Sequence, residues 1–176
     1  QYCIDELTYI PDNNFEQHLI DEGMDDTPLD NYVPTEKINM VESLYMYQIG
    51  VSDLTGIEGF INLKSLCVGN FGVALLEECT AGEPCDINDI EIDENGNPIA
   101  VNPLNFNNIT TLDLSNNSLL EAAYIFNIGL NTLNLGNNTN LKKLWSFHNN
   151  LTTLDISENS GLEEVFLNYN NLTTFD

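Results

Sequence analysis

Large aromatic side chains recur at a fixed spacing in the C-terminal half of the chain. Trp145, the only tryptophan, lies 21 positions after Tyr124 and 21 positions before Phe166. Further ring-bearing side chains follow two or three positions later, namely Phe126, Phe147, His148 and Tyr169. Trp and Tyr anchor many protein interfaces, and flat aromatic faces also suit sugar rings. We therefore predict that these seven residues, called the aromatic stripe below, form an outward-facing patch that binds a ligand.

The aromatic stripe has two other interpretations that the sequence leaves open. Aromatic pairs on neighbouring strands stabilise a sheet by roughly 0.2–1 kcal/mol each, so the stripe could be purely structural. An insertion or a downstream domain could also cover it. Tyr45 and Tyr47 occupy equivalent positions earlier in the chain, but an intervening insertion leaves open whether they share the same face.

An acidic segment holds the residue types that bind calcium. Glu91, Asp93 and Asn95 place side-chain oxygens at alternate positions, and Gly96 follows at the turn. The match is imperfect, because the first ligand is Glu and Asn102 stands where a bidentate Glu is expected. Asn-Gly between Ile-rich flanks also signals a β-hairpin, which is the interpretation we favour. No other cofactor is expected.

The four cysteines favour an oxidising compartment over a metal site, because no pair has the Cys-x-x-Cys spacing. Cys79 and Cys85 bracket a turn-rich loop that a disulfide could close, although two free thiols remain the alternative. A bond between Cys3 and Cys67 has weaker support.

Residues for catalysis are not recognisable. No nucleophile elbow or phosphate-binding glycine loop occurs, and neither His18 nor His148 has a Ser or Cys at a familiar spacing. Carboxylates such as Glu163 and Glu164 are too abundant for a pair to be informative. We therefore predict that the chain is not an enzyme.

A 21-residue repeat positions the aromatic stripe. Residues 109–129, 130–150 and 151–171 align without gaps, and a fourth repeat begins at Leu172. Each repeat opens with L-x-x-L-x-L-x-x-N and then repeats a similar phrase. Alternating Leu predicts short strands, and strands this short must stack on the same strand of the next coil. The sequence therefore predicts a β-rich solenoid of short parallel strands in 21–22-residue coils.

Recurrent asparagines accompany the leucines in these coils. An Asn amide both donates and accepts, so it can satisfy backbone groups where a coil turns. We interpret five of them as scaffold, forming a ladder along the solenoid: Asn117, Asn138, Asn149, Asn159 and Asn170.

An earlier block carries a related phrase with a 22-residue spacing. It includes Val51-Ser-Asp-Leu54-Thr-Gly-Ile57 and the apolar positions from Val41 to Val68. With residues 104–176, this block resembles the internalin-like leucine-rich-repeat proteins of bacterial surfaces. The resemblance implies a leucine-rich-repeat solenoid and a secreted or surface-attached recognition domain, without naming a ligand.

A short helix precedes the repeats. Asp12 or Asn13 can cap it, Glu16 follows Asn13 by three positions, and Gly23 can end it. Its apolar face would cover the open end of the first coil. We thus predict a helical cap over 1–37, repeats over 38–70, a loop or hairpin insertion over 71–103, and 21-residue two-strand repeats over 104–176.

Charge and composition restrict the partners. The formal net charge is −24, so nucleic acid is excluded as a partner, and an anionic membrane surface is disfavoured. No apolar run is long enough to insert into a membrane.

The chain begins at Gln1 without Met, which fits a mature secreted chain or a fragment boundary. We predict an extracellular or cell-surface module for recognition or adhesion, which binds a protein or a glycan. A carbohydrate-binding module and a structural spacer are the alternatives.

Overall fold

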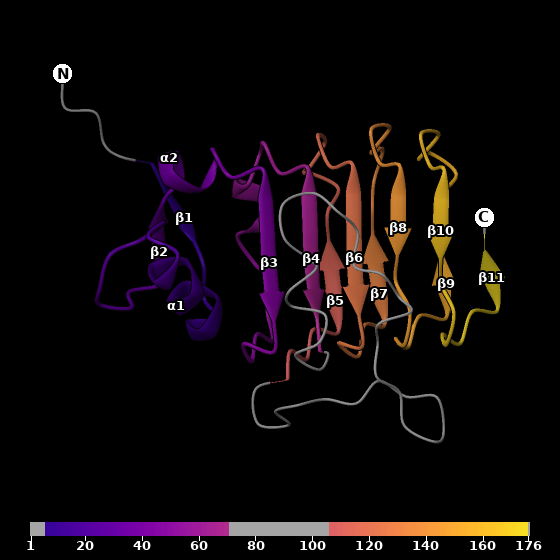
Figure 1. Ribbon diagram of the computed structural model, residues 1–176, viewed down its shortest axis with the longest axis horizontal. Helices are drawn as coiled ribbons and strands as arrows, with labels where there is room; N and C mark the ends of the chain where they lie inside the picture. The colour runs from indigo at the N-terminus through magenta and orange to yellow at the C-terminus, as the bar shows by residue number, and fades with distance from the viewer. Residues whose placement is uncertain (1–5, 71–105, 176) are drawn as a thin grey trace.

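The computed structural model describes residues 6–70 and 106–175, and it is a β-solenoid with a helical cap at its N-terminal end (Figure 1). One layer of the solenoid is a five-stranded parallel sheet with the order β10-β8-β6-β4-β3. Its strands are β3 (Ser43–Tyr47), β4 (Ser65–Gly69), β6 (Ala122–Phe126), β8 (Lys143–Trp145) and β10 (Glu164–Phe166). The predicted fold class is confirmed.

Strand register gives the length of each coil. Ser43 lies opposite Ser65, an offset of 22 residues, and later neighbours in the sheet are offset by 21, as in Ala122 opposite Lys143. Between β4 and β6 the offset is 57, because Ser65 lies opposite Ala122. The sheet therefore continues without a gap across the segment that breaks the repeat.

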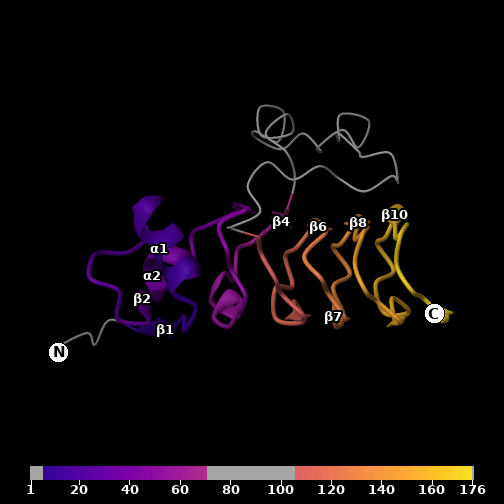
Figure 2. The same cartoon turned by 90° about the horizontal axis from the view of Figure 1, so that it is seen from below.

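The second layer consists of shorter strands, β5 (Thr111–Asp113), β7 (Thr132–Asn134), β9 (Thr153–Leu154) and β11 (Thr174–Phe175). They form two parallel pairs, β5 with β7 and β9 with β11. Figure 2 shows the two layers along the solenoid. Leucines of both layers, such as Leu133 and Leu144, are buried in one continuous core. The L-x-L phrases thus place their leucines inside, as the alternation predicts.

The N-terminal cap contains β1 (Leu7–Tyr9), α1 (Asn13–Asp21), β2 (Tyr32–Pro34) and α2 (Thr35–Ile38), and a 3₁₀ turn (Ile57–Gly59) follows in the solenoid. Asp12, rather than Asn13, is the N-cap of α1, and its Oδ1 accepts from the N–H groups of Asn14 and Phe15. Asp12 Oδ2 accepts from the N–H groups of Ser52 and Asp53. One carboxylate therefore starts the helix and ties it to the first coil.

The buried face of α1 covers the first coils as predicted. Phe15 and Leu19 are fully buried, and the Phe15 ring stacks on Phe60 with ring centroids 6.0 Å apart. Ile20, which the sequence places on the same face, is only half-buried. Glu16 does not complete a capping box, because its Oε1 instead accepts from the backbone N–H groups of Asp30 and Asn31.

The asparagine ladder is confirmed by its hydrogen bonds. Asn149 Oδ1 accepts from the N–H groups of Ile128 and Leu130, and its Nδ2 donates to the Ile125 carbonyl. Asn170 makes the corresponding bond to Leu151 one coil later. In the other turn, Asn117, Asn138 and Asn159 donate to backbone carbonyls of the preceding coil. Each amide satisfies backbone groups that the turn leaves open.

One member of the ladder, Asn107, precedes the first aligned repeat and was not predicted. Asn107 Oδ1 accepts from the Val51 N–H at 3.0 Å, and its Nδ2 donates to the Met46 carbonyl at 2.8 Å. Asn70 and Asn107 also bond reciprocally, at 2.7 Å in both directions. The two buried amides therefore join the chain on either side of the break and keep the ladder intact.

Several predicted features lie outside the described residues: the Cys79–Cys85 disulfide and the calcium loop of Glu91, Asp93 and Asn95. Cys67 is a free, buried thiol, and Cys3, its weakly supported partner, lies outside the described residues. Within residues 6–70 and 106–175, no helix is long and apolar enough to cross a membrane.

Candidate functional site

Strand pairing brings three residues of the aromatic stripe, Tyr124, Trp145 and Phe166, into one row on the five-stranded sheet. Tyr45 lies opposite Cys67, Cys67 opposite Tyr124, Tyr124 opposite Trp145, and Trp145 opposite Phe166. The row therefore crosses all five strands, from β3 to β10. This register settles the position of Tyr45, which shares its face with the later aromatics despite the intervening segment.

A second row runs beside the first. Tyr47 lies opposite Gly69, and Gly69 lies opposite Phe126. The rings of Phe126 and Phe147 are in contact, with centroids 4.5 Å apart. These side chains and the first row form a cluster that is separate from the leucine core. Alternation along each strand sends Ala123 and Ile125 inward, so Tyr124 and Phe126 lie on the outer face.

The expectation that this face is exposed is wrong for most of the stripe. The exposed fraction is 7% for Tyr124, Trp145 and Phe147, and 1% for Phe126. Phe166 and His148 are half-buried, and only Tyr169 is well exposed, at 66%. The rings pack edge to face along the row, which removes part of their surface from water.

Trp145 lies at the centre of the row. Its ring meets Tyr124 at 5.3 Å with an interplanar angle of 89°, and Phe166 at 5.1 Å with an angle of 76°. Its indole Nε1 is buried and has no hydrogen-bond partner in the described part of the chain. A buried indole N–H usually finds an acceptor, so this donor is an unsatisfied polar group inside the aromatic cluster.

His148 and Tyr169 extend the stripe past the ends of β8 and β10. Both have positive φ angles, 53° and 58°, as do Gln48 and Asn127 at the same corner of earlier coils. The two rings stack with centroids 4.1 Å apart and an interplanar angle of 12°. Burial lowers the pKa of His148, so the imidazole is neutral at pH 7. The exposed end of the stripe is therefore an uncharged pair of stacked rings.

Cys67 and Tyr47 form a polar contact inside this aromatic cluster that sequence reasoning missed. The Tyr47 hydroxyl lies 2.6 Å from Cys67 Sγ, and burial raises the pKa of the Cys67 thiol to about 12. Burial also raises the pKa of Tyr47. A thiol that stays protonated is a poor nucleophile, so the contact is structural. The alternation of Leu66 and Val68 in the core could have identified Cys67 as an outward position.

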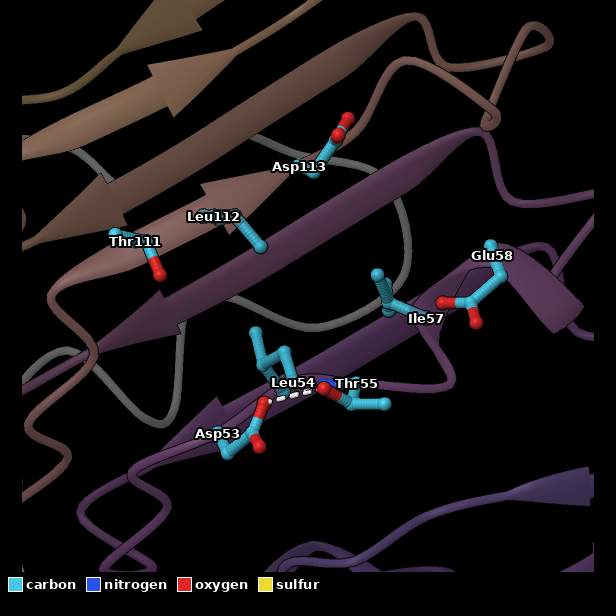
Figure 3. Close-up of a pocket in the computed structure, with 8 residues that line it drawn as sticks. All are labelled: Asp53, Leu54, Thr55, Ile57, Glu58, Thr111, Leu112 and Asp113. Carbon is cyan, nitrogen blue, oxygen red and sulfur yellow. Dashed lines mark hydrogen bonds between the residues drawn. The ribbon is translucent and has the colours of Figure 1, made fainter.

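The outer surface of the shorter strands is different in character. Thr111, Asp113, Thr132 and Asn134 are all exposed. A pocket of about 250 Å³ lies beside β5, lined in part by Asp53, Glu58 and Asp113 (Figure 3). Its carboxylates accept hydrogen bonds from backbone N–H groups of neighbouring turns.

Local hydrogen bonds account for the carboxylates of this pocket. Asp53 Oδ1 accepts from the N–H and hydroxyl of Thr55, and Asp113 Oδ1 accepts from the Ser115 N–H. Hydrogen bonds from Ser115 also lower the pKa of Asp113. Within the described ranges, no group of three or more His, Cys, Asp or Glu side chains could hold a metal ion. The aromatic face is therefore the better candidate for a binding surface.

Comparison with known proteins adds a structural similarity. No protein-family model and no curated protein matches the sequence. Among solved structures, the chain is similar to a functional domain of InlJ from Listeria monocytogenes that includes a cysteine ladder. The sequences are 20% identical, the TM-score is 0.38, and the match covers 100% of this chain and 46% of that chain. The chain thus spans less than half the length of that protein domain, and its fold class rests on its own strand register.

Proposed function

We propose that this chain is an extracellular recognition module that binds a protein or another surface ligand through the outer face of its five-stranded sheet. The observation that carries the proposal is the aromatic cluster on that face, which is separate from the leucine core and ends in the exposed Tyr169. Tyr and Trp are the residues that most often anchor protein interfaces.

The outward positions of a solenoid contribute less to its stability than the inward ones. Stacked coils are held together by their inner core, so outward positions are free to carry other residue types. On the shorter strands these positions carry Thr, Asn and Asp, whereas on the five-stranded sheet they carry Tyr, Trp and Phe. The accessible part of the cluster lies at Phe166, His148 and Tyr169, and we place the contact surface there.

The proposed location is the outside of a cell, either secreted or attached to the surface. It is supported by the sequence resemblance to internalin-like repeats and by the net charge of −24, which suits a salty external medium. A nucleic acid or an anionic membrane would be repelled by that charge. We propose a binding function without catalysis.

Two alternatives each have an observation in their favour. The stacked and exposed ring of Tyr169 also suits a sugar, so the module could bind carbohydrate. The burial of Trp145 and Phe126 instead favours a structural role for the stripe, as in a spacer within a longer surface protein. The following experiment separates the three possibilities.

Binding of the wild type and a Tyr169→Ala variant should be measured on a glycan array and on an array of purified extracellular proteins. Tyr32→Ala is the matched control, because Tyr32 is a 45% exposed tyrosine on the cap, remote from the stripe. We expect a protein ligand whose binding falls at least about tenfold in Tyr169→Ala and is unchanged in Tyr32→Ala.

Binding to glycans alone, with the same dependence on Tyr169, would select the carbohydrate module. Binding to neither array, or equal binding by all three proteins, would contradict a recognition function of this face. Fluorescence of Trp145, the only tryptophan, gives a second measurement, because a ligand at the stripe should change its emission.

A further inference from the structure

Two carboxylates in the N-terminal cap are buried with unsatisfied oxygens. Glu16 is fully buried and Asp25 is 8% exposed. Glu16 Oε2 and Asp25 Oδ2 have no hydrogen-bond partner within residues 6–70 and 106–175. Buried polar atoms are paired in the great majority of cases, and a buried charge without a partner is strongly destabilising. These two oxygens therefore require an explanation.

The two carboxylates belong to one small region. Glu16 lies on α1, and its Oε1 accepts from the N–H groups of Asp30 and Asn31, at 2.6 and 2.9 Å. The loop from Met24 to Asn31, which carries Asp25, therefore folds against the face of α1 that carries Glu16. Burial raises the pKa of Asp25, a backbone hydrogen bond from Asp26 opposes that rise, and the nearby charges of Glu16, Asp30 and Asp26 add to it.

No basic side chain compensates this negative charge. The four ion pairs among the described residues involve Lys37, Lys64, Lys142 and Lys143, and none of them reaches Glu16 or Asp25. Lys37 pairs with Asp26 at 3.8 Å, and the Asp26 side chain is 91% exposed. Neither carboxylate therefore has a cationic side chain as a partner within residues 6–70 and 106–175.

We propose that Glu16 and Asp25 bind a divalent cation, with calcium as the ion that best fits the site. Calcium prefers carboxylate oxygens and completes its six to eight ligands with backbone carbonyls and water. Because no group of three or more His, Cys, Asp or Glu side chains that could hold a metal exists among the described residues, the remaining ligands would be carbonyl, amide or hydroxyl oxygens and water. Magnesium requires stricter octahedral geometry, and zinc prefers nitrogen and sulfur ligands.

The bound ion would hold the cap together. It would join α1 to the loop between Met24 and Asn31, and α1 in turn contacts the first coils through Asp12 and Phe15. Calcium would thus stabilise the end of the solenoid that the cap covers. The proposed ligands differ from Glu91, Asp93 and Asn95, which the sequence offers as a calcium loop only as the alternative to a hairpin.

The test is calcium titration of the full chain after removal of metal with EDTA, followed by isothermal calorimetry and thermal unfolding. Saturable binding should raise the wild-type Tm by roughly 5–10 °C at a calcium concentration 100-fold above Kd. Glu16→Gln and Asp25→Asn should each weaken binding at least about tenfold. Asp26→Asn is the matched control and should retain the Tm increase, because the Asp26 side chain is 91% exposed.

Asp25→Asn also keeps the test valid if Glu16→Gln fails to fold. Without calcium, Asp25→Asn should melt at or above the wild-type temperature, because it removes an uncompensated buried charge. Sodium chloride at equal ionic strength measures the general screening of a chain with net charge −24. The proposal is overturned if sodium chloride and calcium have the same effect, or if all variants respond to calcium equally. It is also overturned if calcium has no effect and acidification alone stabilises the cap, since a shared proton would then hold the pair.

Discussion

The two layers of the solenoid present opposite outer surfaces on the same repeat. The shorter strands expose Thr111, Thr132 and Asn134, which are small and polar. The five-stranded sheet instead carries an in-register row of rings, in which Tyr124 and Trp145 are each 7% exposed. After residue 106 both layers have the same 21-residue period, and both direct apolar side chains into one core. The comparison shows that the outward positions, which the inner core does not constrain, distinguish the two surfaces.

The difference has an energetic consequence. A side chain that is exposed on a strand contributes little to stability, whereas a ring that is buried contributes several kcal/mol wherever it lies. The aromatic face is therefore both a candidate binding surface and a second, smaller apolar core outside the first. Three measurements test this comparison.

The largest expected effect follows from truncating a buried ring. Phe126 is 1% exposed and contacts Phe147, so Phe126→Ala should lower the free energy of unfolding by about 3–5 kcal/mol. Thr132→Ala, on the exposed polar surface, should change it by less than about 1 kcal/mol. Urea unfolding of both variants measures the difference. Similar losses in the two variants would show that the aromatic face is no more structural than the polar one.

The asparagine ladder lies at the coil turns between the two layers and should give the next largest effect. Asn149→Ala leaves the N–H groups of Ile128 and Leu130 without their acceptor, and should cost about 2–4 kcal/mol. Asn150→Ala is the matched control, because Asn150 is exposed and donates only a 3.4 Å bond to the Gly129 carbonyl. Equal denaturation midpoints for the two variants would show that the buried Asn149 amide contributes no more to stability than the exposed Asn150 side chain.

Much of the scaffold could be predicted from the sequence, because its causes are local and periodic. Inward leucines, the ladder and the helix after Asp12 all follow from spacing and residue type. Asn107 lies two 21-residue periods before Asn149, but it was missed because it precedes the first aligned repeat and its hydrogen bonds to Val51 and Met46 reach 56 and 61 positions back along the chain.

The candidate site was predictable only in part. The alternation correctly assigned Tyr124 and Trp145 to the face opposite the leucine core, and register placed them in one row. Their exposure was predicted wrongly, because alternation fixes the direction of a side chain and not the neighbours that cover it. The burial of Glu16 was missed for a similar reason, since its partners lie in a loop 14 and 15 positions away.

The smallest expected effect concerns the exposed end of the stripe, where the two surfaces are most alike. Burial lowers the pKa of His148 below its ordinary value of 6.5, so the unfolded chain binds protons more readily than the folded chain. Stability should therefore be full above about pH 6.5 and fall as the pH decreases towards the lowered pKa.

The His148→Asn variant removes this proton uptake and keeps a residue that occurs at the same corner of the preceding coil, where Asn127 has a φ of 50°. Between pH 7.5 and 5.5 the wild type should lose more stability than this variant, by less than about 1 kcal/mol. His18, whose pKa is also lowered by burial, is present in both proteins and cancels in the comparison. A variant that loses stability as steeply as the wild type would show that the end of the stripe is as open to water as the threonines of the other layer.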